Sequence, residues 1–373
     1  MARPTPPLSQ VLPPLVLGTA TFNNQYNSNP HSLATTAIVH RALDLGVRAF
    51  DTSPYYGPAE SLLGQALQSQ SAVPRADYIL QSKCGRLSAD KFDYSPLWIK
   101  KSVKRSLQRL GTDYLDVVFC HDVEFVEPRD VVAAVRTLRE LRDCGLVRYV
   151  GISGYPTGVL AALAQLVKDQ TGEPLDAVMS YANYTLQNTL LFSQALGRLL
   201  QAGVDCVLNG SPLGMGLLRN QGVPVGDLGD FHPAPDGLRR RCVDASEVMR
   251  RYGDDGGRLE ILALRFSIEG WVRDGSRAGT AVKPLSSASP GGGGGLREVR
   301  FAGPRIGINV AGVSYIRELE EVMAIWRDVV GALERDFLYE KVMAVFGDEW
   351  RDYAWPSPGE GCAGGDSLIK SRM

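Results

Sequence analysis

The most regular feature of the chain is the alternation of short apolar runs with longer amphipathic segments. Each run is rich in Val, Ile, Leu or Phe and has the length of a strand, and a segment with helical periodicity follows it. The eight predicted strands cover residues 15–18, 48–50, 78–83, 115–121, 149–153, 177–181, 204–209 and 308–313. A repeated strand and helix pattern of this kind is typical of a parallel sheet.

Two of the helical segments show the periodicity most clearly. In residues 33–46 the apolar side chains recur every three to four positions, and residues 131–145 repeat the same pattern. Short polar residues are expected to cap the starts of these helices, and glycines are expected to end them. The predicted cap and stop are Ser32 and Gly46 for the first helix, and Asp130 and Gly145 for the second.

Eight strand and helix pairs in 373 residues predict a (β/α)8 TIM barrel with insertions. A doubly wound open sheet is the alternative. Residues 219–237 are rich in Gly and Pro and predict a long loop between the seventh strand and its helix, while residues 286–295 have low complexity and predict a flexible surface insertion. We expect residues 1–356 to form a single barrel domain and residues 357–373 to be a disordered tail.

Charge and composition exclude several classes of protein. Lys and Arg number 40 against 41 Asp and Glu, so a net charge of −1 gives no overall attraction to nucleic acids or acidic membranes. No apolar run approaches the roughly 18 residues that a membrane helix needs, and prolines interrupt the apolar stretch near the start. We therefore expect a cytoplasmic protein with no membrane or nucleic-acid partner.

Cysteine and histidine are few and scattered, which argues against a metal site. The six cysteines, expected to be buried thiols, are Cys84, Cys120, Cys144, Cys206, Cys242 and Cys362. They form no C-x-x-C pair, and none of the four histidines has a His or Cys partner at the spacing of metal ligands.

Polar side chains stand at the ends of successive predicted strands. In a parallel barrel these carboxyl ends meet at one mouth, where the active site lies. The residues are Asp51 and Tyr56 after the second strand, then Lys83, His121, Ser153, Ser180 and Ser211 after the third to the seventh. Singly, Asp51 could cap a turn, Tyr56 could pack at the surface and His121 could lie in the core. Lys83 could simply be solvated.

Together, the phenol, ammonium, carboxylate and imidazole could transfer a proton. The unperturbed pKa of a tyrosine is about 10, so a nearby cation must favour the phenolate before it can act as a base near neutral pH. Lys83 can supply that charge, and Asp51 would hold Lys83 in place and keep it protonated. A neutral His121 would donate a hydrogen bond to the reacting oxygen.

The order of motifs resembles the aldo-keto reductase superfamily. The motifs are DTSPYYG, QSKCG, CHD, GISGY, SPLGMGLL and GVSYIRELEE, and the resemblance runs from about residue 15 to about residue 335. It implies a catalytic tetrad of Asp51, Tyr56, Lys83 and His121. The motifs FDTSPYYG, CHDVEF, SPLGMGLL and a looser GVP…FHPAPDGL are similar to the branch of sugar 1-dehydrogenases, which oxidise an aldose at its anomeric carbon to the lactone.

The resemblance also implies a dinucleotide bound in an extended pose across the strand ends. The expected cofactor contacts are Ala20, Thr21, Ser153, Ser180, Ser211, Leu213, Gly216, Gly312, Ser314, Glu318 and Glu321. The expected substrate contacts are the loop aromatics Phe22, Tyr26, Phe125 and Trp355. Two departures stand out. Only Ser153 remains of the usual Ser, Asn and Gln clamp on the nicotinamide, whose other positions are Gly154 and Ser180, and Gly210 replaces the usual stacking aromatic.

The end of the last strand favours NAD over NADP. Family members that use NADP usually place Arg or Lys just after this strand, where the cation binds the 2′-phosphate. Here Ser314 and Glu318 take those positions, and Glu318 would repel a phosphate but could accept a hydrogen bond from a ribose hydroxyl. Alternatively, Glu318 and Glu321 could only cover the first turn of the last helix, and a rotated Arg317 could restore NADP binding.

The sequence thus predicts NAD-dependent oxidation of an aldose at C1, with D-arabinose as the favoured substrate and Tyr56 as the proton acceptor. We expect a monomer or a weak homo-oligomer. One alternative is an NADPH-dependent aldehyde or ketone reductase that uses the same four residues in reverse. Another is a non-catalytic regulatory subunit that senses the nucleotide, because fold alone does not fix function.

Overall fold

Eight parallel strands close into a barrel in the computed structural model, which describes residues 6–223, 229–252, 257–282, 305–331, 336–355 and 357. The strands are β1 (Leu15–Gly18), β2 (Ala49–Asp51), β3 (Ile79–Cys84), β4 (Leu115–His121), β5 (Val147–Gly154), β6 (Ala177–Tyr181), β7 (Cys206–Gly210) and β8 (Ile308–Gly312). Each strand pairs with the next, and β8 pairs with β1. This confirms the (β/α)8 barrel and excludes the open sheet.

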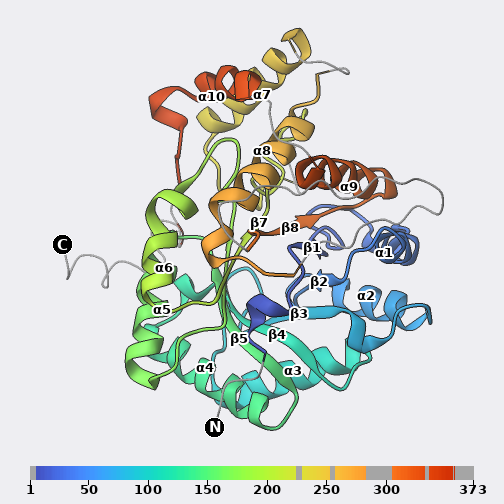
Figure 1. Ribbon diagram of the computed structural model, residues 1–373, viewed down its shortest axis with the longest axis vertical. Coiled ribbons are helices and arrows are strands. Elements are labelled where there is room, and N and C mark those ends of the chain that lie inside the picture. The colour runs from blue at the N-terminus through green and yellow to red at the C-terminus, as the bar shows by residue number, and fades with distance from the viewer. Residues whose placement is uncertain are drawn as a thin grey trace.

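Helices surround the barrel as an outer layer (Figure 1). They are α1 (Thr35–Asp44), α2 (Ala59–Gln68), α3 (Pro96–Leu110), α4 (Pro128–Asp143), α5 (Thr157–Thr171), α6 (Gly197–Gln201), α7 (Asp236–Tyr252), α8 (Leu259–Asp274), α9 (Ile316–Gly331) and α10 (Asp336–Trp350). α7 and α10 pack against each other at one end of the molecule. They add a small second apolar cluster beside the barrel mouth.

Two predicted helix starts are wrong. Ser32 belongs to a short 3-10 turn, where its hydroxyl donates to the carbonyl of Asn29, and α1 begins three residues later. Asp130 lies in the first turn of α4, which begins at Pro128 because proline suits the first helical position. The predicted stops hold, since Gly46 and Gly145 both have positive φ just past the helix ends.

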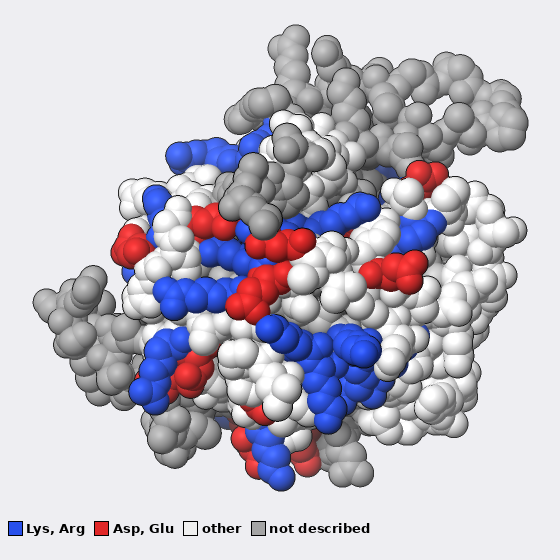
Figure 2. Space-filling model, turned by 90° about the horizontal axis from the view of Figure 1, so that it is seen from below, with Lys and Arg blue, Asp and Glu red and all other residues white. Residues whose placement is uncertain are grey.

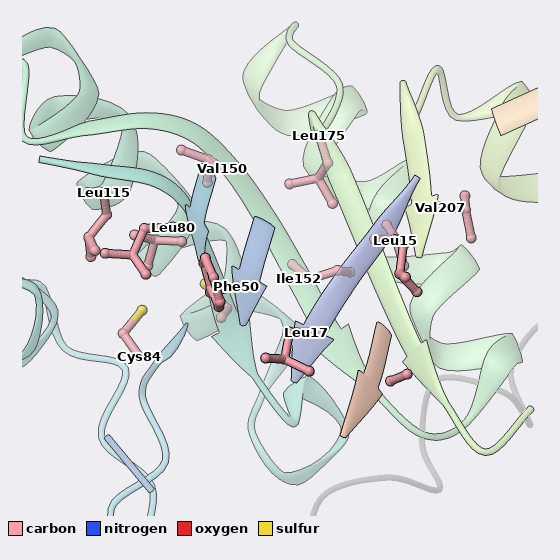
Figure 3. Packing of buried hydrophobic residues seen from close by; sticks show 14 of the residues in the cluster. Leu15, Leu17, Phe50, Leu80, Cys84, Leu115, Val150, Ile152, Leu175 and Val207 are labelled. Atoms are coloured by element: carbon pink, nitrogen blue, oxygen red, sulfur yellow. The ribbon is translucent and has the colours of Figure 1, made fainter. Parts of the chain in front are cut away.

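The alternation of side chains along each strand divides the core into two layers. Val16, Val117 and Phe119 point into the barrel and pack with other strand residues. Their neighbours point outward, as Leu17 and Val150 do in Figure 3, and pack against the helices. The same alternation decides which strand-end residues face the barrel mouth.

The remaining sequence expectations have mixed outcomes. Cys144 is exposed at the end of α4, so the expectation of a buried thiol there is wrong, whereas Cys84, Cys120, Cys206 and Cys242 are buried. The loop predicted between β7 and α7 is present, although residues 224–228 lie outside the described ones. Cys362, residues 286–295 and the tail after Ser357 also lie outside them.

Candidate active site

A cavity of about 450 Å³ opens at the carboxyl ends of the strands. Asp51, Tyr56, Lys83 and His121 all line it. The predicted cofactor residues that also line it are Ala20, Thr21, Ser153, Ser211, Leu213, Gly216, Gly312, Ser314, Glu318 and Glu321. The predicted substrate residues Tyr26, Phe125 and Trp355 line it as well. This volume is typical of small-molecule sites.

The barrel geometry explains why the four predicted catalytic side chains converge. Asp51, Lys83 and His121 occupy inward-facing positions near the ends of three neighbouring strands. Tyr56 follows in the turn between β2 and α2, where its backbone N–H donates to the carbonyl of Ser53. A phenol, an ammonium, a carboxylate and an imidazole therefore meet at one mouth.

Asp51 and Lys83 form a buried ion pair. Lys83 Nζ lies 2.6 Å from Asp51 Oδ2 and also donates to the carbonyl of Thr52 at 3.0 Å. Burial raises the pKa of Asp51, while the charge of Lys83 opposes that rise. Lys83 Nζ lies 4.9 Å from the centre of the Tyr56 ring, so the ammonium is held directly beside the phenol.

The structure differs from the expected ionisation of Tyr56. Burial, together with the negative charges of Asp51 and Asp122, raises the pKa of Tyr56 well above its ordinary value. Burial and these negative charges dominate, so the nearby Lys83, paired with Asp51, does not bring Tyr56 to ionise near neutral pH. Tyr56 is a neutral phenol at neutral pH in this structure.

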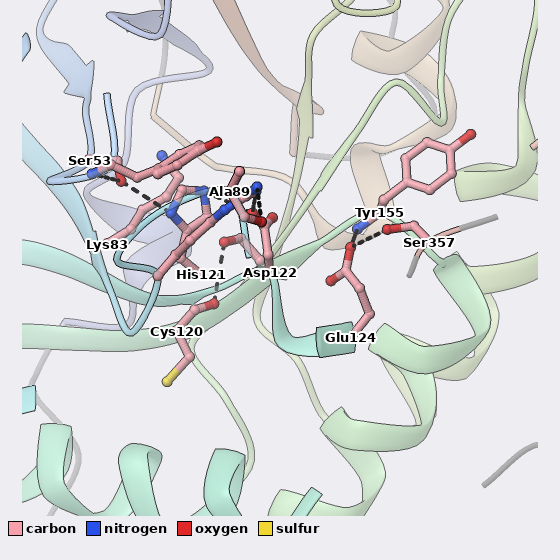
Figure 4. Close-up of polar contacts among 12 residues, drawn as sticks. Ser53, Lys83, Ala89, Cys120, His121, Asp122, Glu124, Tyr155 and Ser357 are labelled. Carbon is pink, nitrogen blue, oxygen red and sulfur yellow. Dashed lines mark hydrogen bonds and ion pairs between the residues drawn. The ribbon is translucent and has the colours of Figure 1, made fainter. Parts of the chain in front are cut away.

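His121 is neutral, and only one of its two ring nitrogens, Nδ1, is hydrogen-bonded to a described residue. Burial lowers the pKa of His121 to about 3. Its Nδ1 lies 3.1 Å from the hydroxyl of Ser53, as Figure 4 shows, and that hydroxyl already accepts the backbone N–H of Tyr55. Because no other described residue accepts the proton of this hydroxyl, we assign the Ser53 O–H as the donor to Nδ1, which places the ring proton on Nε2. Nε2 has no hydrogen bond to another described residue and can donate to a substrate oxygen.

Two predicted contacts are corrected by the structure. Ser180 faces outward on β6, where its hydroxyl accepts from Asn183 Nδ2 at 2.9 Å, and the inward-facing Met179 and Tyr181 line the cavity instead. Phe22 is fully buried in the hydrophobic core and does not line the cavity.

Gly154 also faces outward, toward a buried carboxyl group. A Cβ at this position would lie 2.4 Å from Glu124 Oε2, so a larger residue would require the Glu124 carboxyl group to move. Glu124 Oε1 accepts the backbone N–H of Tyr155 and the hydroxyl of Ser357, which ties the C-terminal segment to the barrel (Figure 4). Burial and the charge of Asp122 raise the pKa of Glu124 to about 8.

The sequence reasoning missed two charged residues that line the cavity, Arg86 and Asp122. They form an ion pair beside His121, and the Arg86 guanidinium stacks on the Tyr55 ring at 4.0 Å. Asp122 stands directly after the last residue of β4 within the CHD motif, so its position at a strand end was an available signal. Arg86 comes from a loop, where no periodicity predicts the direction of a side chain.

The other end of the cavity suits a dinucleotide. The loop after β7 contains Ser211, Met215 and Gly216 with positive φ, so its backbone turns tightly along the cavity. Glu318 in the first turn of the long helix α9 pairs with Arg219 of this loop, and backbone N–H groups at a helix N-terminus favour phosphates. Arg219 and Arg258 also line this end.

The predicted nucleotide-selecting carboxylates have protein partners. Glu318 accepts the backbone N–H of Ser314 at 2.7 Å and lies 3.4 Å from Arg219. Burial alone would raise the pKa of Glu321, but hydrogen bonds from Arg258 and Arg317 lower it. Arg317 does not line the cavity and donates to Glu321, and Glu318, in the first turn of α9, binds the backbone N–H of Ser314 just before the helix.

Comparison with known families identifies the chain. The model of the aldo/keto reductase family matches residues 14–330. The chain belongs to the aldo/keto reductase family. It is therefore an oxidoreductase of a family that uses nicotinamide cofactors and acts on small molecules.

Sugar dehydrogenases are among the relatives of this aldo/keto reductase. D-arabinose 1-dehydrogenase of Saccharomyces cerevisiae is 40% identical over 265 residues, which cover 70% of this chain and 77% of the relative. L-galactose dehydrogenase of Arabidopsis thaliana is 36% identical over 235 residues, covering 62% and 69%. A glycerol dehydrogenase of Gluconobacter oxydans has a similar structure, with a TM-score of 0.61, 19% identity and coverage of 94% and 96%, which supports the fold alone.

The described residues of this aldo/keto reductase contain neither a membrane-spanning helix nor a cluster of metal ligands. Within them, no helix has the length and apolar character needed to cross a membrane. The same part of the chain holds no group of three or more His, Cys, Asp or Glu side chains placed to bind a metal ion.

Proposed function

We propose that this aldo/keto reductase is an NAD-dependent aldose 1-dehydrogenase, with D-arabinose as its favoured substrate. The observation that carries the proposal is the convergence of Asp51, Tyr56, Lys83 and His121 on one cavity. The similarity to D-arabinose 1-dehydrogenase and L-galactose dehydrogenase supports an aldose as substrate.

The chain's own residues bind, orient and exchange a proton. His121 Nε2–H would donate to the C1 oxygen of the cyclic sugar, and Tyr56 would take the proton of the C1 hydroxyl. As that O–H bond breaks, the C1–H bond breaks with its electron pair and the C1=O bond of the lactone forms. Nicotinamide, when bound, supplies the acceptor of that hydride. Asp51 fixes Lys83 beside Tyr56, where the ammonium would stabilise the phenolate that must form before Tyr56 can take this proton.

NAD is the proposed nucleotide because two carboxylates of α9, Glu318 and Glu321, line the cavity. A rotated Arg317 could bind the 2′-phosphate of NADP, but here Arg317 donates to Glu321 at 2.9 Å. The cations that line this end are Arg219 and Arg258, and Glu318 and Glu321 offset their charges. A free ribose hydroxyl therefore suits this end better than a phosphate.

One observation favours the reductase alternative. Tyr56 is a phenol at neutral pH, and a phenol is ready to donate a proton to a carbonyl oxygen. Reduction of an aldehyde would therefore be the direction preferred at neutral pH, while oxidation would need a higher pH. Both directions use the same four residues.

Turnover of the purified protein tests the proposal. Aldoses and aldehydes are assayed in both directions with NAD(H) and NADP(H), and kcat/KM is compared. The proposal expects oxidation of D-arabinose with a preference for NAD. A clear preference for NADP would favour the reductase, and binding of a nucleotide without turnover of any substrate would favour the regulatory subunit.

Replacing Tyr56 by phenylalanine tests the proton step. Tyr56→Phe removes only the hydroxyl, so turnover should fall by about 10²- to 10⁴-fold while nucleotide affinity stays close to wild type. Stopped-flow rates and fluorescence titration of the nucleotide measure the two effects. A variant with more than half of the wild-type rate would contradict the assigned role.

A further inference from the structure

Among the described residues that line the cavity, each of the four cations is paired with a carboxylate. The pairs are Lys83 with Asp51, Arg86 with Asp122, Arg219 with Glu318, and Arg258 with Glu321. The first belongs to the proposed proton-transfer group, and the last two lie at the proposed nucleotide end. The pair of Arg86 and Asp122 lies beside His121, and the proposed reaction gives it no task.

Arg86 is held in one orientation by contacts on several sides. Its guanidinium lies 4.0 Å from the centre of the Tyr55 ring, and one Nη donates to the Asp122 carboxylate. Its Nε and other Nη donate to the carbonyls of Ser88 and Ala89, both at 3.2 Å. A cationic side chain fixed in this way loses little further freedom when it binds a ligand.

The pair retains polar atoms that the described residues do not engage. A guanidinium has five N–H donors, and three of those of Arg86 are used by described residues. Asp122 Oδ1 is buried and has no hydrogen-bond partner among the described residues. Asp122 Oδ2 lies 3.6 Å from His121 Nε2, as the close-up in Figure 4 places them, so the pair stands directly beside the proposed reacting oxygen.

We propose that Arg86, oriented by Asp122, binds the hydroxyl on the carbon next to the reacting carbon and thereby selects sugars over plain alcohols and aldehydes. An aldose carries a hydroxyl on C2, and this oxygen accepts hydrogen bonds readily. Hydrogen bonds from a charged donor are stronger than those between neutral groups. The inference rests on the proposed function, because it takes His121 as the residue that meets the C1 oxygen.

The pairing of charges also predicts a preference for neutral sugars. Asp122 offsets the positive charge of Arg86, so a phosphorylated sugar finds no unpaired cation among the described lining residues at this end. Asp122→Asn would leave the Arg86 charge uncompensated. Arg86 is thus the specificity residue, and Asp122 is a positioning residue that also lowers the attraction for anions.

Two matched pentoses test the role of Arg86. We would measure kcat/KM for D-arabinose and for its 2-deoxy analogue with the wild type, with Arg86→Met and with Arg86→Lys. Arg86→Met should lower kcat/KM for D-arabinose by about 10- to 100-fold, and for the 2-deoxy sugar by much less. Arg86→Lys keeps a cation beside Asp122 but loses the fork of donors, so its effect should be intermediate.

The control is Arg265→Met. Arg265 pairs with Asp328 at 2.6 Å between α8 and α9 and does not line the cavity, so both sugars should keep their wild-type kcat/KM. Thermal melting shows whether each variant folds. An equal fall for both sugars in Arg86→Met, or no fall for either, would overturn the inference.

The second readout concerns charge. Asp122→Asn should raise kcat/KM for D-arabinose 5-phosphate relative to D-arabinose by about tenfold, and an unchanged ratio would contradict the positioning role. If the wild type oxidises no aldose, the proposed function fails. Calorimetric binding of D-arabinose and its 2-deoxy analogue then still tests Arg86. The inference requires that the wild type binds D-arabinose more tightly than the 2-deoxy sugar and that Arg86→Met binds both equally.

Discussion

The ionisation of Tyr56 depends on how much of the positive charge of Lys83 is offset by Asp51. Lys83 lies 4.9 Å from the Tyr56 ring but forms its shortest contact with Asp51, at 2.6 Å. The burial of Tyr56 therefore outweighs the ammonium, and the pKa of Tyr56 rises. Tyr56 therefore rests as a phenol, although the Lys83 ammonium stands where a cation would favour the phenolate.

The protonated resting state of Tyr56 predicts that the rate of oxidation depends on pH. The wild-type rate of oxidation should increase as the pH rises into the alkaline range, because only the phenolate can accept the substrate proton. Lys83→Met removes the cation, which raises the pKa of Tyr56 further, so the rate should fall by about 10²- to 10⁴-fold and its rise should move to higher pH. Rates measured from pH 6 to pH 10 test this.

Lys100→Met serves as the control, because Lys100 pairs with Glu140 at the surface. It should keep the wild-type profile. A Lys83→Met profile with the wild-type shape and position would show that Lys83 does not act on Tyr56.

Glu124 predicts a dependence of stability on pH. Its pKa in the folded protein, raised to about 8 by burial and by Asp122, lies above the value of about 4.3 in an unfolded chain. The folded state thus binds more protons, and its stability falls as the pH rises between these values. Glu124→Gln stays neutral, so relative to wild type it should gain at least about 1 kcal/mol in unfolding free energy between pH 5 and pH 8.

Urea unfolding at the two pH values measures this gain. Glu247→Gln removes a carboxylate that is 63% exposed on α7, and it should show no comparable change between the two pH values. An identical pH dependence in wild type and Glu124→Gln would contradict the buried, protonated state of Glu124.

At the scale of elements, α2 and α3 approach each other closely at Gly64. A Cβ at this position would lie 2.2 Å from the backbone carbonyl oxygen of Arg109. Gly64→Ala should therefore lower the unfolding free energy by about 1–3 kcal/mol, because the two helices must move apart. Gly158→Ala in α5 is the matched control, since its Cβ would meet nothing within 4 Å.

Gly158→Ala should leave stability unchanged or raise it by up to about 1 kcal/mol, because alanine favours a helix more than glycine does. Thermal and urea unfolding of the two variants give the comparison. Equal stability of the two alanine variants would mean that α2 and α3 are not in close contact.

The elements also show what could be predicted from the sequence. The strands are buried on both faces and therefore stand out as short apolar runs, so each predicted strand lies within two residues of the observed one. The alternation of side-chain direction along the strands brings Asp51, Lys83 and His121 to the mouth. It also turns Ser180 outward, a consequence that the sequence reasoning did not draw.

Other features depend on contacts between distant segments. The start of α1 could not be found from Ser32, because the preceding 3-10 turn uses the hydroxyl of that residue. The orientation of Arg86 depends on Tyr55 and Asp122, which follow other strands. The roles assigned to the individual site residues and the extent of a single domain over residues 1–356 remain predictions.

At the scale of the molecule, charge is divided into small groups. Lys and Arg side chains alternate with Asp and Glu over much of the face in Figure 2, apart from one larger basic group. The net charge is −1. Any attraction for a polyanion is therefore local, and small molecules reach the cavity without a strong overall field.

The described flanks of the glycine-rich segment lie just before β8, on the side of the barrel away from the cavity. These flanks are joined by two backbone hydrogen bonds between Thr280 and Ile306, of 2.8 and 2.7 Å. Because closing a loop costs little more when its length changes modestly, shortening residues 290–295 to two residues should change stability by less than about 1 kcal/mol. Melting temperature and kcat/KM should both stay close to wild type.

A large loss in either quantity would show that the segment packs on the barrel or reaches the cavity. Shortening by the same number of residues on the cavity side, within the loop after β7, is the comparison. That change should reduce activity, because Leu213 and Gly216 of this loop line the cavity.

The contact between Gly154 and Glu124 restricts the order in which the two positions can change during evolution. An asparagine introduced first at position 154 would collide with the carboxyl group, which lies 2.4 Å from the site of its Cβ. A small residue introduced first at position 124 would leave the buried N–H of Tyr155 without its acceptor. A side chain at position 154 therefore requires the Glu124 carboxyl group to turn away from its place beside Tyr155, so a change at one position is easiest when it follows a compensating change at the other.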